Sequence, residues 1–236
     1  MKSPVVIRTV VKIYVKRRAL DSFSLVVPPQ ATLGLVGENG SGKTTLMMAV
    51  SGFVRADGGE IDVCGRGPFD PATHAGCLGM IPQDSEPMPE ARPLDLLTRL
   101  GIQQGLGRAE ARRQSERLLA EFNLSDRAHM PFRALSHGMR KRVMTAQAFL
   151  GDPALVLLDE PFNGLDPVET ERLRRFIRAR RGRRTLVLSS HNLVDIEKLC
   201  THVAFITKGR VETVCTMEEL AKTGKSLESI YLEGRL

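Results

Sequence analysis

Several features that would assign a chain to a special class of protein are missing from this sequence. No run of residues approaches the ~20 apolar positions of a membrane-spanning helix. Charges at Lys2 and Arg8 interrupt the N-terminal segment before the apolar region of a signal peptide could form. No internal repeat, heptad series or low-complexity linker marks a second domain. We therefore expect a soluble, cytoplasmic chain that forms one domain over residues 1–236 and that could still dock onto a membrane protein.

Cysteine is scarce, and the four that occur lie far apart in the sequence, at Cys64, Cys77, Cys200 and Cys215. There is no CxxC pair and no nearby cluster of Cys and His. The spacing therefore argues against a structural zinc site and against a disulfide framework. We expect these cysteines to be reduced, as in a reducing compartment.

The composition is otherwise ordinary, with 42% hydrophobic and 26% charged residues, which excludes disordered, collagen-like and fibrous classes. A net charge of +7 would suit an acidic partner such as phosphate, anionic lipid or nucleic acid. One segment without acids holds eight arginines: Arg172, Arg174, Arg175, Arg178, Arg180, Arg181, Arg183 and Arg184. Leu173, Phe176 and Ile177 lie among them, so we predict an amphipathic helix with a solvated basic face. Contact with anionic lipid or with an acidic loop of a membrane protein is the alternative.

Short apolar and β-branched runs alternate with longer helical stretches, a pattern typical of an α/β fold with a largely parallel sheet. The predicted strands cover residues 32–36, 78–82, 154–158, 185–188 and 202–207. Between the second and third of these, residues 84–149 carry leucines at helical spacing and no convincing strand, and we interpret them as a helical insertion. Ligands of such folds bind at the carboxyl ends of the strands, so polar residues there are candidates for the site.

A phosphate-binding motif follows the first predicted strand. The pattern G-x-x-x-x-G-K-[ST] is satisfied by Gly37, Glu38, Asn39, Gly40, Ser41, Gly42, Lys43 and Thr44, and Thr45 continues into a helix-forming run. Glycines let the backbone wrap around anionic oxygens, N–H groups at a helix N-terminus supply positive potential, and Lys43 adds a full charge. The Thr44 hydroxyl is a suitable ligand for Mg²⁺. The sequence therefore predicts a nucleoside triphosphate site rather than a glycine-rich turn that contains a lysine by chance.

Two carboxylates, Asp159 and Glu160, follow the apolar strand at residues 154–158. Adjacent carboxylates are costly at a buried strand end unless they have a function. Asp159 suits the Mg²⁺ shell, and Glu160 is placed to polarise the water that attacks the γ-phosphate; a charged turn is the alternative. The strand at residues 185–188 leads to His191, which taken alone could be either a solvated surface residue or a catalytic group.

Together with a further segment, these motifs resemble the nucleotide-binding subunit of an ATP-binding cassette (ABC) transporter over nearly the whole chain. That segment, Leu135-Ser136-His137-Gly138-Met139, is similar to the family signature LSGGQ and lies between the phosphate loop and the acidic strand, as in the family. The remaining matches are Gln83 to the Q-loop glutamine, Asn163-Gly164-Leu165-Asp166 to the D-loop, His191 to the switch histidine and Tyr14 to the aromatic residue that stacks on adenine. For Tyr14, a strand residue that packs inward is the alternative.

The resemblance implies a P-loop NTPase fold of ABC type with a mainly parallel sheet core and an N-terminal antiparallel β subdomain. It implies a nucleotide-binding core over residues 1–83 and 150–236, and an inserted helical subdomain with the signature over residues 84–149. ATP and Mg²⁺ are the implied ligands. The implied metal residues are Thr44, Gln83 and Asp159, the catalytic residues are Glu160, His191 and Gln83, and the nucleotide residues are Tyr14, the phosphate loop from Gly37 to Thr45, the signature loop and Asp166.

The resemblance also implies partners. Two cassettes would pair head to tail, so that Ser136 and the Gly138 N–H of one subunit hold the γ-phosphate bound by the other. The second ABC ATPase subunit could be identical or different. Integral-membrane permease subunits would hold the cassettes at the inner face of the cell membrane, and no nucleic acid is expected.

His137 and Met139 depart from the family signature, which usually has glycine at the first position and often glutamine at the second. Binding of ATP is still expected, whereas the departures bear on the rate of hydrolysis. Residues 226–232 resemble the ending of cassettes that serve ABC-2-like efflux permeases, so we expect export, with import as the alternative. A non-transport ABC ATPase acting on nucleic acid or ribosomes is the alternative function, and a generic P-loop kinase or GTPase would not need the combined motifs.

Overall fold

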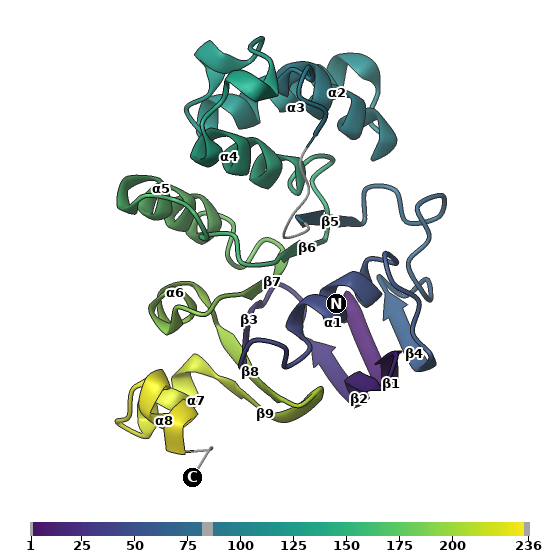
Figure 1. The fold of residues 1–236 in the computed structure, drawn as a ribbon, viewed down its shortest axis with the longest axis vertical. Helices are drawn as coiled ribbons and strands as arrows, with labels where there is room; N and C mark the ends of the chain where they lie inside the picture. Colours follow the sequence, from purple (N-terminus) through teal and green to yellow (C-terminus); the bar gives the residue numbers. More distant parts are fainter. Residues whose placement is uncertain (1, 82–86, 234–236) are drawn as a thin grey trace.

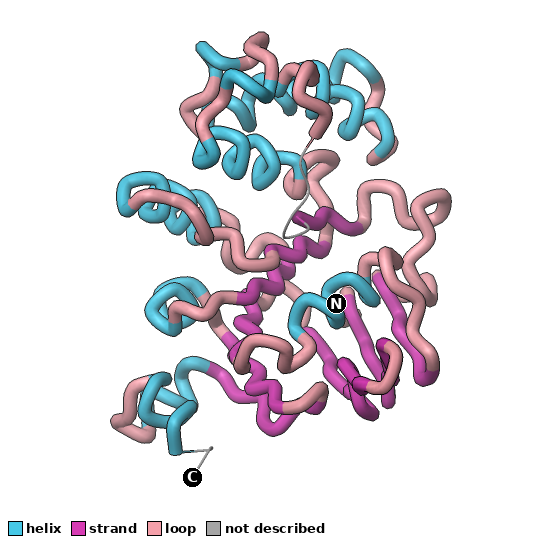
Figure 2. The backbone as a smooth tube through the Cα atoms, viewed as in Figure 1, coloured by secondary structure: helices cyan, strands magenta, loops and turns pink. Residues whose placement is uncertain are grey.

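The computed structural model describes residues 2–81 and 87–233, and Gln83 of the predicted site lies outside the described residues. In the described part, two β-sheets pack with helices around them, and a further group of helices lies at one end of the molecule (Figures 1 and 2). The expected fold class is confirmed, because one sheet is antiparallel and the other is mostly parallel.

The larger sheet forms the centre of the molecule, with the strand order β5-β6-β7-β3-β8-β9. Its strands are β3 (Thr32–Val36), β5 (Leu78–Ile81), β6 (Leu155–Leu158), β7 (Thr185–Ser189), β8 (His202–Thr207) and β9 (Arg210–Thr216). Neighbouring strands are parallel except for the pair β8–β9. Every residue of β3, β6 and β7 is buried, because apolar layers cover both faces of the sheet.

Each face of this sheet has its own covering layer. Helix α1 (Lys43–Val50) and the antiparallel sheet share one hydrophobic cluster with it, and α5 (Pro167–Arg178) and α6 (Leu193–Leu199) share the other. Helices α7 (Met217–Lys222) and α8 (Leu227–Glu233) follow β9. The phosphate loop, the acidic pair and His191 each follow a central strand, so they meet at the same edge of the sheet.

The antiparallel sheet has the strand order β2-β1-β4 and is formed by β1 (Val5–Tyr14), β2 (Arg17–Val27) and β4 (Gly58–Val63). Residues that point toward α1, such as Val5, Ile7 and Phe23, are buried, whereas the opposite face carries exposed side chains such as Arg8. Irregular pairing interrupts β1 after Ile7.

A group of helices lies between β5 and β6 in the sequence, as expected for the insertion, and occupies the upper end of Figure 1. Its helices are α2 (Pro93–Gln103), α3 (Arg108–Glu121) and α4 (His137–Gln147), with two short 3-10 turns, Ser125–Arg127 and Phe132–Ala134. Leu97, Leu118, Phe122 and Phe132 are almost completely buried among them. None of the described helices is long and apolar enough to cross a membrane.

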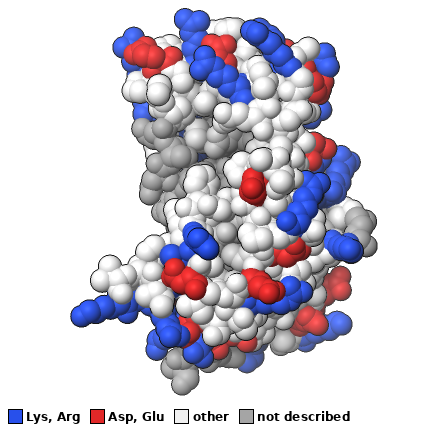
Figure 3. Space-filling model, turned by 90° about the vertical axis from the view of Figure 1, so that its right-hand side faces the viewer, with Lys and Arg blue, Asp and Glu red and all other residues white. Residues whose placement is uncertain are grey.

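The arginine-rich segment forms α5 and the turn after it, and α5 buries Leu173, Phe176 and Ile177 as predicted for an amphipathic helix. Several of its arginines have acidic partners: Arg172 with Glu169, Arg174 with Asp195, Arg180 with Glu121 and Arg184 with Asp152. The pairs of Arg174, Arg180 and Arg184 join this segment to other parts of the chain, whereas Arg172 pairs within α5. Figure 3 shows a different face, the right-hand side of Figure 1 and so the side away from α5, and on that face basic and acidic side chains are interspersed.

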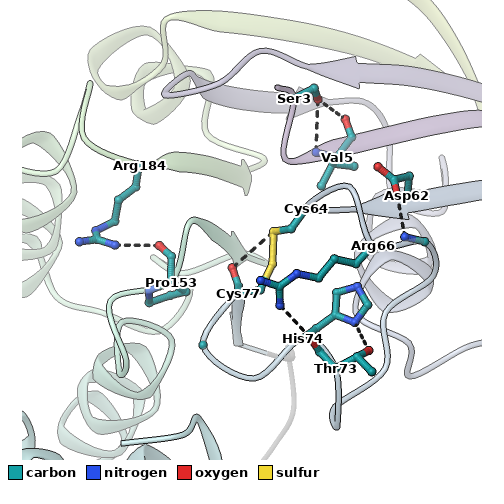
Figure 4. Close-up of a disulfide and its surroundings, with 12 residues drawn as sticks. Ser3, Val5, Asp62, Cys64, Arg66, Thr73, His74, Cys77, Pro153 and Arg184 are labelled. Atoms are coloured by element: carbon teal, nitrogen blue, oxygen red, sulfur yellow. Dashed lines mark hydrogen bonds between the residues drawn. A yellow bond between two sulfur atoms is a disulfide. The ribbon is translucent and has the colours of Figure 1, made fainter. Parts of the chain in front are cut away.

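Cys64 and Cys77 form a disulfide (Figure 4), so the expectation of reduced cysteines is wrong for these two residues. Cys64 follows β4 and Cys77 precedes β5, and the intervening loop folds back on itself. The Cys77 N–H donates to the His74 carbonyl at 2.9 Å, and Arg66 donates to the Thr73 carbonyl at 2.7 Å. Tertiary folding therefore brings together two cysteines whose sequence separation carries no motif. Cys200 and Cys215 are free.

Candidate functional site

The phosphate loop connects β3 to α1 and surrounds Lys43. The Lys43 Nζ donates to the Gly37 carbonyl at 2.7 Å and to the Glu38 carbonyl at 2.9 Å. Burial lowers the pKa of Lys43, and the nearby charges of Glu160 and Asp159 oppose this effect. Gly42, at the N-cap of α1, has φ of 112° and gives no side-chain cap. The first N–H groups of α1 are therefore not capped by a side chain at Gly42 and can bind an anion.

The two carboxylates after β6 are held by one hydroxyl from β7. Ser189 Oγ donates to Asp159 Oδ1 at 2.6 Å and accepts from the Glu160 N–H at 2.9 Å. Asp159 is 1% exposed, and its second oxygen, Oδ2, is buried without a hydrogen-bond partner in the described structure. An unpartnered buried carboxylate oxygen is costly in isolation, so this atom fits a cation ligand.

Glu160 and His191 contact each other directly. Glu160 Oε2 lies 2.9 Å from His191 Nδ1, and because an ionised carboxylate only accepts, Nδ1 is the donor in that state. Glu160 has φ of 45°, a left-handed conformation that costs a non-glycine residue about 1–3 kcal/mol. The Ser189 hydrogen bond to its N–H helps to hold this conformation, which turns the carboxylate toward His191.

These groups converge on a cavity of about 700 Å³. Of the predicted site residues, Tyr14, Asn39, Gly40, Gly42, Lys43, Thr44, Thr45, Asp159, Glu160 and His191 line it. Tyr14 is 43% exposed, which disfavours the alternative that it packs inward. Glu38 and Ser41 line a neighbouring cavity of about 440 Å³ instead. Arg17, which no sequence motif singled out, also lines the larger cavity, as does Asn163 at the start of the segment matched to the D-loop.

The signature loop and Asp166 lie elsewhere in the chain. Leu135 is buried, and Ser136 caps α4 by accepting from the Met139 N–H at 3.3 Å. Asp166 caps α5 by accepting from the Glu169 N–H at 2.9 Å. Among the described residues that line the large cavity there is no member of the signature loop, including His137 and Gly138, and Asp166 is absent as well.

The described residues hold no group of three or more His, Cys, Asp and Glu side chains that could bind a metal ion by themselves. A cation here would therefore depend on the Asp159 carboxylate together with hydroxyl and phosphate oxygens. The Thr44 side chain lies in the same cavity and can supply such a hydroxyl.

Comparisons with known proteins agree with this geometry. The family model described as ABC transporter matches residues 20–163. The chain is 34% identical over 208 residues to Nod factor export ATP-binding protein I of Cupriavidus metallidurans, covering 86% of this chain and 68% of the relative. It is 31% identical to the lipopolysaccharide export system ATP-binding protein LptB of Haemophilus influenzae, covering 94% of this chain and 93% of that protein.

Among solved structures, one described as the ATP binding subunit of an ABC transporter superposes with a TM-score of 0.89 at 28% identity, covering 98% of this chain and 99% of the other. The family match spans more than half of the chain and includes the phosphate loop, the signature loop and both carboxylates. The chain therefore belongs to the ABC transporter family, as a nucleotide-binding subunit with ATPase activity.

Proposed function

We propose that the residues around the large cavity hydrolyse ATP with Mg²⁺ and that this hydrolysis energises a separate integral-membrane permease. The observation that carries the proposal is the convergence of Lys43, Asp159, Glu160 and His191 on one cavity. No described residue of the signature loop lines that cavity. This observation supports a site that a second subunit must complete.

The phosphate loop and the acidic pair bind different groups, the phosphates of ATP and the Mg²⁺ ion. Lys43 and the N–H groups at the start of α1 bind the phosphates. Asp159 Oδ2 and the Thr44 hydroxyl would hold Mg²⁺, with Gln83 as a further ligand. When bound, the ion neutralises charge that develops on the phosphates. This assignment is supported by the buried, unpartnered state of Asp159 Oδ2.

Glu160 acts as the general base. Its carboxylate accepts a proton from the attacking water, and His191 orients that water and contacts the γ-phosphate. The direct contact between Glu160 Oε2 and His191 Nδ1 supports this pairing, because both side chains then meet at the same end of the cavity.

A second cassette completes the site. In a head-to-tail pair, Ser136 and the Gly138 N–H at the start of α4 would bind the γ-phosphate held by the partner, since a helix N-terminus attracts an anion. The subunits could be identical or different. Opening and closing of this pair is the motion that the permease converts into substrate movement.

The direction that we propose is export, from the inner face of the cell membrane. The names of two relatives, a Nod factor export protein and a lipopolysaccharide export protein, support it. Attachment through a permease is consistent with the lack of a membrane-spanning helix among the described elements.

The variant Glu160→Gln tests the catalytic assignment. The amide keeps the shape of the side chain but cannot accept the proton, so we expect hydrolysis to fall by at least ~100-fold while ATP binding is retained. ATP should then shift the variant from monomer to dimer in size-exclusion chromatography. Hydrolysis at the parent rate would show that Glu160 is not the base, and an ATP-loaded monomer would contradict the head-to-tail pair.

The permease is tested separately by purifying the tagged chain from detergent extracts. A membrane protein that copurifies would support the proposal if vesicles that lack this protein show no transport coupled to ATP hydrolysis. Salt-resistant gel shifts with DNA or RNA, in the absence of any membrane partner, would instead favour the non-transport alternative.

A further inference from the structure

Arg17 lies beside Tyr14 because of the hairpin that joins β1 to β2. The two residues are cross-strand partners, and only Val15 and Lys16 form the turn between them. Directly opposed residues of an antiparallel pair project from the same face of the sheet. Both side chains accordingly line the large cavity that contains the phosphate loop.

The guanidinium of Arg17 extends onto the tip of the phosphate loop. Its Nη2 donates to the Gly40 carbonyl at 2.5 Å. A Cβ built on Gly40 would lie 2.5 Å from the same nitrogen, so the absence of a side chain there admits the guanidinium. Gly40 also has φ of 78°, which glycine adopts at little cost. The loop and the hairpin are therefore shaped to place a cation over Gly40.

Arg17 differs from Arg18 and Lys12 in the charge it faces. Arg18 forms an ion pair with Asp21 at 2.8 Å, and Lys12 forms one with Asp57 at 3.0 Å. Within the described residues, no carboxylate lies at ion-pair distance from Arg17, and its one hydrogen-bond partner is the neutral Gly40 carbonyl. A guanidinium has five N–H donors, so most of its capacity is available to an anionic ligand.

The position of Arg17 in the cavity indicates which part of a nucleotide it would reach. Tyr14 marks the end for the base, whereas Glu160 and His191 mark the end where the γ-phosphate reacts. Arg17 is the cross-strand partner of Tyr14 and contacts Gly40 of the loop that cradles the α- and β-phosphates. Its ligand would thus be the part shared by ATP and ADP.

We infer that Arg17 is a further nucleotide-binding residue, whose guanidinium leaves the Gly40 carbonyl and binds oxygens of the α- or β-phosphate. One hairpin then holds both the base, through Tyr14, and the phosphate chain, through Arg17. This inference deepens the proposed function and rests on the orientation of the nucleotide given there.

Direct binding measurements on Arg17→Ala test the inference. We expect the Kd values for ATP and for ADP both to rise about tenfold, which corresponds to about 1.4 kcal/mol, because a charge-assisted contact to phosphate is lost. Arg17→Lys keeps the charge but not the planar fork of donors, and should weaken binding about threefold. In ATPase assays the loss should appear in KM rather than in kcat.

The matched control is Arg18→Ala, which removes one charge from the same turn and should leave both Kd values within about twofold, since Arg18 is directed to Asp21. Thermal melting of each variant shows that it is folded. Equal Kd values for Arg17→Ala and Arg18→Ala would overturn the inference, and so would weakening confined to ATP, which places the contact at the γ-phosphate. Neither result depends on the Glu160→Gln outcome, because binding is measured without hydrolysis.

Discussion

At the scale of single residues, Ser189 is the residue on which the arrangement of the acidic pair depends. Its hydroxyl contacts Asp159 Oδ1 and the Glu160 N–H at once and is completely buried. Glu160 adopts a strained backbone conformation, and such conformations persist only where surrounding contacts hold them. Ser189 is therefore a positioning residue for both carboxylates.

Replacing this hydroxyl should damage both stability and catalysis. We expect Ser189→Ala to lower the free energy of unfolding by about 1–3 kcal/mol, because it leaves Asp159 Oδ1 and the Glu160 N–H without their partner. It should also reduce kcat more than it changes KM. Urea unfolding and steady-state ATPase assays measure the two effects. Ser190→Ala is the control, because its buried hydroxyl contacts Asp195 and the Asn192 N–H instead. Equal kcat losses in the two variants would contradict the positioning role.

At the scale of elements, the strands could be predicted where both of their faces are buried. The continuous apolar run of β6 identified it, and β3, β5 and β7 were found in the same way. Strand β1 carries no such run, because only one face is buried and its pairing with β2 and β4 shifts register. The antiparallel sheet was therefore expected from the family resemblance and not from its own residues.

The residues of the site also fall into those that a local sequence pattern predicts and those that it does not. The phosphate loop and the acidic pair are continuous in sequence, so their pattern indicated their chemistry. Arg17 and Ser189 act through contacts with residues far away in the chain, at Gly40 and Asp159, and no local pattern predicts such contacts. A polar residue at the carboxyl end of a strand was the available signal for Ser189.

The signature loop and the D-loop also meet within one chain, at the starts of α4 and α5. A Cβ built on Gly164 would lie 2.6 Å from His137 Nε2, so the histidine ring packs over the D-loop backbone. Arg142 of α4 and Glu169 of α5 add a buried ion pair at 3.1 Å. The departure from glycine at His137 thus introduces a contact between the D-loop and the signature loop, which is proposed to act on the partner's nucleotide.

Gly164→Ala tests this contact. We expect a loss of about 1–3 kcal/mol in unfolding free energy, because Gly164 has φ of 76° and a methyl group would displace the His137 ring. In a His137→Ala background the same change should cost less, since only the backbone strain remains. A double-mutant cycle by urea unfolding gives the coupling between the two positions. Identical costs in both backgrounds would show that the ring makes no energetic contribution.

At the scale of the whole molecule, the antiparallel sheet is joined to the central sheet by contacts at separate places. Asp21 of β2 accepts from Arg210 of β9 at 2.7 Å, and its N–H donates to the Gly209 carbonyl at 2.9 Å. Hydrogen bonds from Arg210, and to a smaller extent from Arg18, hold the pKa of Asp21 below its usual value. The disulfide between Cys64 and Cys77 joins the end of β4 to the start of β5. The two sheets enclose α1 between them. These links therefore hold Tyr14 and Arg17 in place relative to the phosphate loop, which leads into α1.

Of these links, we expect the disulfide to make the largest contribution to the free energy of unfolding that can be measured separately. A cross-link that closes a loop of this length restricts the unfolded chain, so reduction should lower the unfolding free energy by about 3 kcal/mol. Thiol titration of the denatured, unreduced chain should detect Cys200 and Cys215 alone, and denaturation is needed because burial raises the pKa of the Cys200 thiol. Cys64→Ser should show the lower stability without reductant and should not respond to it. Cys215→Ser, which removes a free thiol, should keep the full response. Four titratable thiols in the chain purified without reductant, or a Cys64→Ser variant as stable as the parent, would show that the cross-link does not hold the two sheets together in solution.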